Sequence, residues 1–428
     1  MPSLPLEGLR VIDLSMWFAG PMGSRLLADM GAEVIKVESL GHIDPWRGPA
    51  RVTPILIERM PDMASVEKPY NHSAGFNLQN RNKLGITLDL QTGQGKEIFK
   101  KLVKISDIVL ENYSPRVMNS LGIDYPVLRE INPAIILMSL PALGRSGPDK
   151  DHIAFGQTID CMSGMAFLTG YLGEEPMLQS GLSYGDPLSG MNAAFAVLAG
   201  LRQRRKTGEG MHIEISQVEG VISFNADSIM DYTMNGRIHE RMGNRHPSMA
   251  PHGCYRCKGE DRWVVISIPS DSAWQRFCQV LGQPSWAEDA RFRDLPGRYS
   301  HQDELDRLIE SWTVRYDHYA VLDVLQKADV PAGPVLDAGE LTKEPHLNER
   351  GFYEEVTHPE AGTHYYVGMY AQFSKTPGSI RMPAPCLGEH NHYVLGEMLG
   401  IPEEEIAELE ELGIIGTDAL EEQQGGMF

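Results

Sequence analysis

Apolar and polar residues alternate along the first half of the chain in a pattern that predicts a parallel β-sheet. Short apolar runs have the length and the Val, Ile and Leu content of buried strands, and they lie at residues 9–14, 32–38, 80–90, 108–110, 135–140 and 211–215. The segments between them, such as residues 93–103, space their apolar residues as an amphipathic helix does. Strands that alternate with helices are typical of an α/β protein with an open parallel sheet covered by helices.

A longer apolar run at residues 191–201 predicts a buried helix, which ends in four basic residues and a glycine. Asp186 and Pro187 come just before it, so we expect Asp186 at or next to the helix N-terminus. Two interpretations of Asp186 are open. It is either an N-cap carboxylate or a nucleophile, in which case Gly185 and Gly190 would let a substrate approach closely.

The pattern changes in the second half of the chain. The sequence there predicts a β-hairpin over residues 254–268, helices near 272–281 and 301–313, a strand at 365–373 and an acidic helix within 389–412.

Composition narrows the class of protein. A chain of 428 residues with 42% hydrophobic residues is larger than one ordinary domain. A net charge of −20 disfavours nucleic acid as a partner. The N-terminus lacks the basic and apolar regions of a signal peptide, and no uncharged apolar run reaches the ~18 residues of a membrane span. Five cysteines, an odd number, indicate reduced thiols, so we expect a cytoplasmic protein without membrane association.

Few local motifs carry chemistry. Cys254 and Cys257 near His252 could suggest zinc, but no second ligand pair accompanies them, so two thiols of a hairpin are favoured and no metal is expected. Lys83 and Arg116 each follow a loop and are either phosphate ligands or ordinary surface cations. There is no Walker loop, dinucleotide fingerprint or serine-hydrolase elbow.

Several segments, in this order, resemble the class III coenzyme A transferases, the family of formyl-CoA transferase, carnitine CoA-transferase and the α-methylacyl-CoA racemases. The matching segments cover nearly the whole chain and are residues 6–14 with Ala19-Gly20-Pro21, 27–38, Asn80-Arg81-Asn82-Lys83 with 88–90, Glu111-Asn112, Tyr184-Gly185-Asp186, 206–210 with 216–219, 243–247, 332–335 and 387–390.

This resemblance implies a fold and an assembly. A large Rossmann-like parallel-sheet domain would be built from both chain ends, residues 1–215 and 345–428. A smaller α+β domain would span residues 225–335, with linkers at 216–224 and 336–344. Two subunits would interlock, as a homodimer or as a heteromer with a homologous subunit.

The resemblance also implies an activity: transfer of coenzyme A from an acyl-CoA, such as succinyl-CoA, to a carboxylic acid, with Asp186 as the catalytic nucleophile. The carboxylate would form an anhydride with the acyl group, then an aspartyl-CoA thioester. The residues expected to bind CoA are Phe18, Ala19, Gly20, Lys83, Asn112 and Arg116. The residues expected to meet the substrate are Phe155, Gln157, Gly185, Arg245 and His246.

Some positions depart from the family pattern. Phe18 stands where formyl-CoA transferase has a glutamine, and Ser39 and Ser120 stand where CoA-binding arginines are usual. Residues 243–253, which match the family's flexible glycine loop, are not glycine-rich. Phe18 and apolar neighbours that include Met16, Trp17, Phe155, Met162 and Met165 predict a bulky acceptor such as benzylsuccinate or another substituted dicarboxylate, in the manner of a benzylsuccinate CoA-transferase. Arg47, Arg245 and His246 are candidates for its second carboxylate.

Two alternatives remain open. An acyl-CoA racemase or isomerase would need a histidine where this chain has Phe155, although His152 is nearby. A non-catalytic subunit of a heteromeric CoA-transferase is the other alternative, and the presence of Asp186 argues against it.

Overall fold

The structure, a computed structural model, describes residues 3–59, 63, 65–176 and 183–420. The chain divides into two compact units. The large unit combines Met1–Met165, Leu178–Gly236 and Glu349–Phe428, and the small unit combines Ala166–Met177 and Arg237–Asn348. The large unit is therefore built from both chain ends.

The unit boundaries differ from the predicted ones at three places: residues 216–236 lie in the large unit, and residues 166–177 and 336–348 lie in the small unit. Helix α10 (Gln217–Ile222) stays with the large unit because its Val218 and Val221 pack with Leu188 into one apolar cluster. The segment after Met165 belongs to the small unit, where the carbonyl of Gly170 accepts a hydrogen bond from the Gly243 N–H at 2.8 Å. Neither boundary could be predicted from the sequence, because the apolar pattern continues across it without interruption.

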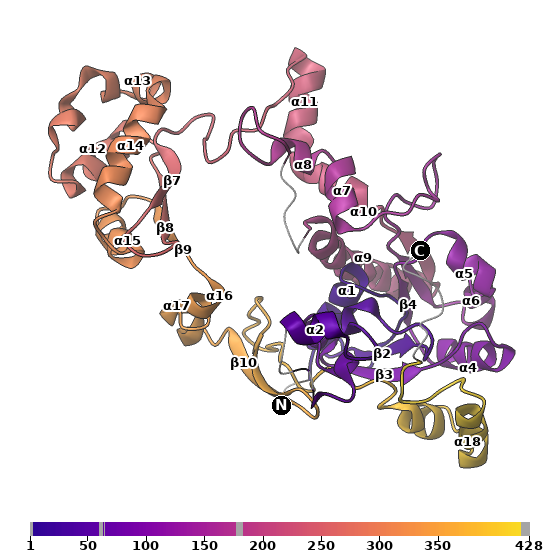
Figure 1. The fold of residues 1–428 in the computed structure, drawn as a ribbon. Helices are drawn as coiled ribbons and strands as arrows, with labels where there is room; N and C mark the ends of the chain where they lie inside the picture. The colour runs from indigo at the N-terminus through magenta and orange to yellow at the C-terminus, as the bar shows by residue number, and fades with distance from the viewer. Residues whose placement is uncertain (1–2, 60–62, 64, 177–182, 421–428) are drawn as a thin grey trace. The chain divides into compact units, whose positions relative to one another are not determined.

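The large unit is organised around a six-stranded sheet with strand order β3-β2-β1-β4-β5-β6 (Figure 1). All neighbouring strands are parallel. The strands are β1 (Arg10–Asp13), β2 (Glu33–Glu38), β3 (Lys83–Thr87), β4 (Ile108–Glu111), β5 (Ile136–Ser139) and β6 (Met211–Glu214). The predicted parallel sheet is confirmed, and its strand order is that of the Rossmann fold.

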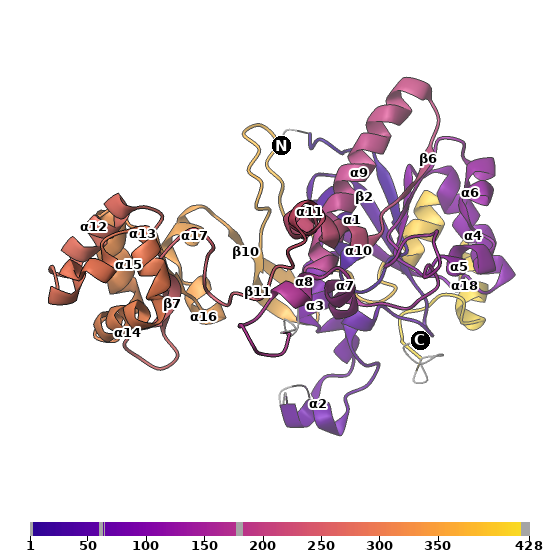
Figure 2. The same ribbon diagram turned by 90° about the horizontal axis from the view of Figure 1, so that it is seen from above.

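Helices cover both faces of this sheet, because β1, β2, β4 and β5 carry apolar residues on both sides. Ile108 and Leu110 of β4 join a cluster with α1 (Ala19–Asp29) and α9 (Gly185–Thr207), whereas Val109 between them joins the cluster on the other face. In Figure 2, α1 and α9 lie on one side of the sheet and α4 to α6 on the other.

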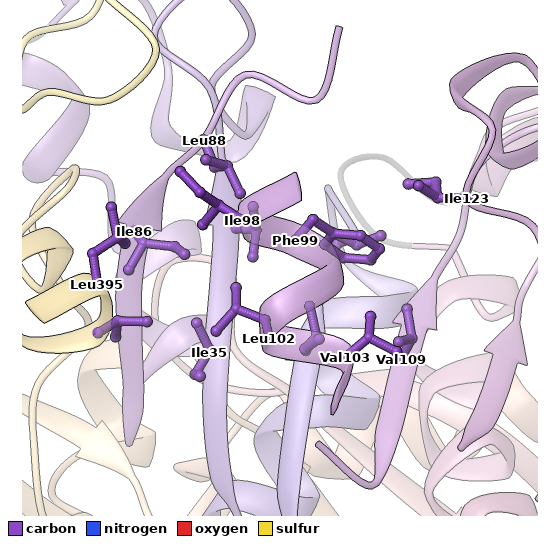
Figure 3. Packing of buried hydrophobic residues seen from close by; sticks show 14 of the residues in the cluster. Ile35, Ile86, Leu88, Ile98, Phe99, Leu102, Val103, Val109, Ile123 and Leu395 are labelled. Atoms are coloured by element: carbon purple, nitrogen blue, oxygen red, sulfur yellow. The ribbon is translucent and has the colours of Figure 1, made fainter. Parts of the chain in front are cut away.

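The second face is closed by α4 (Gly93–Lys104) and by the end of the chain. Phe99, Leu102 and Val103 of α4 lie against Ile35 and Val109 of the strands (Figure 3). The C-terminal segment adds a π-helical turn (Tyr393–Met398) and α18 (Glu403–Glu411) to the same cluster.

The remaining elements of the large unit are shorter. They are α2 (Pro54–Arg59), α3 (Ala74–Asn80), α5 (Arg116–Leu121), α6 (Tyr125–Ile131), α7 (Gly156–Met162), α11 (Ala226–Asn235) and the hairpin β10 (Tyr353–His358) with β11 (Gly362–Val367); α8 (Met165–Leu168) lies at its boundary with the small unit. The strand predicted at residues 365–373 begins earlier, at Gly362, and ends at Val367, which pairs with Tyr353.

The small unit pairs an antiparallel sheet with helices. Its sheet consists of β7 (His252–Arg256), β8 (Trp263–Ser267) and β9 (Ala332–Val335). Its helices are α12 (Asp271–Val280), α13 (Leu295–Ser300), α14 (Gln302–Thr313), α15 (His318–Lys327), α16 (Ala338–Leu341) and α17 (Pro345–Glu349). Helix α17 ends at the unit boundary. The predicted hairpin is confirmed, and buried aromatic residues such as Trp274 and Phe277 form the core. None of the described helices combines the length and the apolar content that a bilayer crossing requires.

Candidate active site

The strand order places a crevice between β1 and β4. Strands β2 and β3 follow β1 in one direction and β5 and β6 follow β4 in the other, so the loops that leave β1 and β4 diverge, which is where open α/β sheets bind ligands. Asn112 joins the two loops. Its Oδ1 accepts the Met16 N–H at 2.8 Å and its Nδ2 donates to the Met16 carbonyl at 2.7 Å. The amide therefore fixes the crevice walls relative to each other.

Two neighbouring pockets open at this crevice. The first has a volume of about 580 Å³, and Trp17, Phe18, Asn112, Phe155, Gln157 and Asp186 are among its lining residues. The second has a volume of about 410 Å³ and is lined in part by Ser39 and Leu40. Met16, His42 and Tyr113 line both pockets, so one extended ligand can occupy both.

Asp186 is the second residue of α9 and lines the first pocket. Its Oδ2 accepts a hydrogen bond from the Ser183 hydroxyl at 3.0 Å. Burial raises the pKa of Asp186 to about 6; the Ser183 hydrogen bond lowers it and the charge of Asp160 raises it. The carboxylate is therefore ionised at neutral pH but more basic than an ordinary aspartate. The N-cap residue of α9 is Tyr184, so the N-cap interpretation of Asp186 is wrong.

Helix α7 packs closely against the beginning of α9. A Cβ on Gly156, the first residue of α7, would overlap with the Ser183 hydroxyl and with Asp186 Oδ2. Further along α7, the carboxylate of Asp160 accepts the N–H groups of Tyr184 and Gly185, each at 3.2 Å. Sequence analysis did not identify Gly156 or Asp160, because no local pattern links α7 to α9.

Aromatic side chains form much of the first pocket's wall. The rings of Trp17 and Phe155 meet edge to face at 5.7 Å, and those of Phe18 and Trp46 lie 5.1 Å apart. Trp17 has a left-handed backbone (φ 65°), and its N–H donates to the buried carboxylate of Asp44 at 3.0 Å. Of the apolar wall residues predicted, Met16, Trp17 and Phe155 line the pocket, whereas Met162 and Met165 do not line either of the two pockets in the described structure.

Lys83 is fully buried beneath this site. Its ammonium donates to Asp13 Oδ2 at 2.9 Å, to Asn80 Oδ1 at 2.8 Å and to the Pro21 carbonyl at 3.1 Å. Burial lowers the pKa of Lys83 to about 8, although Asp13 opposes the change. All three ammonium protons are used, which corrects the expectation that Lys83 holds a phosphate.

Arg47 requires a similar correction. It is fully buried, and its guanidinium pairs with Glu38 at 2.9 Å and donates to Asn71 Oδ1 at 3.1 Å. It is therefore not available for a second carboxylate of the acceptor.

The remaining predicted CoA ligands differ in their positions. Arg116 is exposed and begins α5, between Pro115 of the first pocket and Val117 of the second. Ala19 and Gly20 are buried in the first turn of α1 and are not among the residues that line either described pocket. Any contact they make with CoA would involve the backbone.

The residues predicted to meet the substrate are divided between the large unit and the small unit. Gln157 and Phe155 line the first pocket, and Gly185 is buried against Ile159. Arg245 belongs to the small unit, where it pairs with Asp306 at 2.6 Å and with Asp303 at 2.8 Å. His246 is in the same unit, and its Nδ1 accepts the Ser248 N–H at 3.1 Å. A role for Arg245 and His246 in substrate binding stays a prediction.

Within the described ranges, no three His, Cys, Asp or Glu side chains are placed to hold a metal ion. Cys254 and Cys257 are free thiols in and next to β7.

Comparison with known proteins gives a consistent result. The sequence profile described as CoA-transferase family III matches residues 6–391. The chain is 34% identical to a succinyl-CoA–D-citramalate CoA-transferase of Chloroflexus aurantiacus, over 97% of this chain and 99% of that protein. It is 31% identical to a succinate–glutarate CoA-transferase of Agrobacterium fabrum, over 92% and 96%. It is 29% identical to a formyl-CoA:oxalate CoA-transferase of Rhodopseudomonas palustris, over 96% and 97%.

A solved structure agrees with these relatives. The crystal structure of a CaiB/BaiF family protein from Brucella suis superposes with a TM-score of 0.81 at 29% identity, covering 92% of this chain and all of that one. The family match spans both ends of the sheet and the loops that form the crevice. The chain therefore belongs to CoA-transferase family III, and it is a CoA-transferase.

Proposed function

We propose that Asp186 is the nucleophile of this CoA-transferase. Its carboxylate attacks the thioester carbonyl of the donor acyl-CoA, which forms an acyl–aspartyl anhydride and releases CoA as the thiolate. The thiolate attacks the aspartyl carbonyl, giving an aspartyl-CoA thioester and the donor carboxylate. The acceptor carboxylate attacks that thioester and forms a second anhydride, and the returning thiolate then takes the acceptor acyl group as a new thioester and regenerates Asp186.

The observation that supports this proposal is a partly buried carboxylate that lines a pocket with aromatic side chains in its wall. The pKa of Asp186, raised by burial to about 6, makes the carboxylate a better nucleophile than an exposed aspartate while leaving it charged at pH 7.

The two pockets, which share the lining residues Met16, His42 and Tyr113, are proposed to hold CoA. We infer that the thioester end lies in the first pocket beside Asp186 and that the nucleotide end lies in the second. Arg116 stands exposed between lining residues of both pockets and is the predicted cation for a CoA phosphate.

The acceptor is proposed to be a substituted dicarboxylate, with succinyl-CoA as donor. Two aromatic pairs line the first pocket, and each Å² of apolar surface buried contributes about 25 cal/mol, so a phenyl or alkyl group is favoured by a few kcal/mol. Lys150 and His152 also line this pocket and replace Arg47 as candidates for the second carboxylate. Relatives named for citramalate and glutarate act on dicarboxylates, which supports this class.

The nucleophile is tested with Asp186→Ala. We expect transfer to fall by on the order of 10³-fold or more, while CoA binding by calorimetry stays close to that of the wild type. Hydroxylamine added during turnover should label the peptide that contains Asp186. Substantial transfer by the alanine variant would overturn the assignment.

The acceptor is tested by a screen of carboxylates with succinyl-CoA, read by mass spectrometry. Benzylsuccinate or methylsuccinate should turn over faster than oxalate or formate. Phe18→Gln should reduce this preference by about tenfold, whereas Phe373→Gln, an exposed residue outside both pockets, should leave it unchanged. A faster reaction with oxalate would reject the bulky acceptor.

An acyl-CoA racemase is the second candidate, and one observation favours it: His152 lines the same pocket as Asp186. A racemase exchanges the α-hydrogen of an acyl-CoA without any acceptor. Incubation with 2-methylacyl-CoA in D₂O therefore separates the two functions. Deuterium incorporation without an acceptor supports the racemase, and its absence supports the transferase.

We further infer that the chain works as a dimer. No residue of α11 is buried within a single chain, although Ile229, Met230, Tyr232 and Met234 are large apolar residues on it. An isolated helix of this length is marginal in water, so a partner surface is needed to cover it. A second copy of this chain, or a homologous subunit, is the proposed partner.

A further inference from the structure

Asp160 occupies an unusual position relative to the proposed nucleophile. The first N–H groups of a helix have no partner within the helix and need an acceptor. In α9 these groups include those of Tyr184 and Gly185, and neither the N-cap side chain nor Asp186 accepts them in the described structure. Asp160, from the last turns of α7, accepts both, one on each carboxylate oxygen, at 3.2 Å.

This arrangement separates two roles that an aspartate at a helix start often combines. A carboxylate that caps its own helix has its lone pairs directed to backbone N–H groups. Because Asp160 caps α9 from outside, the Asp186 carboxylate accepts the Ser183 hydroxyl at 3.0 Å and lines the pocket. Asp160 itself is buried and does not line either described pocket, so it is placed to act on Asp186 and not on a substrate.

We propose that Asp160 is a positioning residue for CoA transfer: it caps α9 from outside so that the Asp186 carboxylate is left to face the pocket. This inference rests on the proposed role of Asp186. It assigns to α7 a part in the reaction that the sequence around Asp186 does not indicate.

Electrostatics agree with the geometry. Burial is the largest cause of the raised pKa of Asp186, and the negative charge of Asp160 raises this pKa further. The other titratable side chains that line the pocket are His42, Tyr113, Lys150 and His152. Removal of the Asp160 charge should therefore lower the pKa of Asp186, because a neighbouring negative charge no longer opposes its ionisation.

Asp160→Asn tests the proposal, because asparagine keeps the size of the side chain but removes its charge and can accept only one of the two N–H groups. The measurement is single-turnover acylation of the enzyme by succinyl-CoA, without acceptor, from pH 4.5 to 8. We expect the acid limb of the rate to move to lower pH and the plateau rate to fall by about tenfold to 100-fold. Asp124→Asn is the matched control, since Asp124 also stands at a helix N-terminus in the large unit.

The outcomes are distinct. An Asp160→Asn enzyme with the wild-type acid limb and plateau would overturn the positioning role, provided that Asp186→Ala is inactive. Activity of Asp186→Ala would instead reject the nucleophile itself. If Asp160→Asn does not fold, Asp160→Glu, which keeps the charge, should retain the wild-type acid limb, and a displaced limb in that variant would reject the electrostatic role.

Discussion

The carboxylate of Asp186 has a pKa raised by burial to about 6, and this value predicts a pH dependence. Only the ionised form attacks a thioester. The acylation rate should therefore be constant above pH 7 and should fall about tenfold for each unit below pH 6, because the protonated fraction grows as pH decreases. Single-turnover acylation by succinyl-CoA, without acceptor, measures this limb without interference from acceptor ionisation.

A second group could produce a similar limb, so a control is needed. Burial raises the pKa of Glu111 to about 7, and its Oε2 accepts the N–H of Tyr113, which lines both pockets. In Glu111→Gln the acid limb near pH 6 should persist. A rate that stays constant down to pH 4.5 in the wild type would contradict the assignment to Asp186.

The structure places some of the residues predicted from the sequence in one pocket and others elsewhere; their roles stay predictions. Asp186 and Phe155 were identified from the sequence, and the structure brings both to one pocket. Lys83 was predicted to bind a phosphate, but its ammonium contacts a buried carboxylate. The local sequence around a lysine that follows a loop is the same in both cases. The deciding contact is the ion pair with Asp13 on β1, which is separated from β3 by β2 in the sheet and far away in the sequence.

At the scale of secondary-structure elements, the close contact between helices α7 and α9 leads to a testable prediction. A methyl group on Gly156 would overlap with Ser183 and Asp186, so the two helices must separate in Gly156→Ala. We expect a loss of about 1–3 kcal/mol of stability and about a 100-fold lower transfer rate, because the nucleophile is displaced. Steady-state kinetics and thermal unfolding measure the two effects.

The chain provides a matched control for this variant. Gly93 is also the first residue of a helix, α4, but a Cβ there meets no atom within 4 Å. Gly93→Ala should change neither the rate nor the melting temperature appreciably. If Gly156→Ala behaved in the same way, close contact of the two helices would not be required for activity.

At this scale the sheet could be predicted from the sequence, but the site contacts could not. The apolar pattern identifies β1 to β6 because each strand carries apolar residues within a short segment between helices. The contact of α7 with α9 depends on small residues, Gly156 and Gly185, whose spacing is not periodic. The C-terminal segment returns to the sheet, where Asn391 Oδ1 accepts the Thr87 N–H at 2.9 Å. Because these residues are far apart in the chain, only the family resemblance predicted this return.

For the whole molecule, we predict that dimer formation and folding are coupled. The apolar side chains of α11 and the exposed Phe195 of α9 need a partner surface. The protein should therefore scatter light as a dimer at micromolar concentration, and its melting temperature should rise with protein concentration.

Charge substitutions locate the interface. Met234→Glu should weaken the dimer, whereas Tyr365→Glu, an equally exposed residue on β11, should not. A wild-type protein that is monomeric at micromolar concentration would contradict the prediction.

The buried ion pair between Lys83 and Asp13 has a consequence for how this chain can change over generations. Asp13 is fully buried, and although burial alone would raise its pKa, Lys83 and Lys36 lower it to about 2, so it is always charged. Loss of Lys83 alone breaks this buried ion pair at a cost of about 3–5 kcal/mol, whereas an apolar pair of similar volume can be tolerated. Descendants of this sequence should therefore keep both residues or replace both, and the two positions should covary.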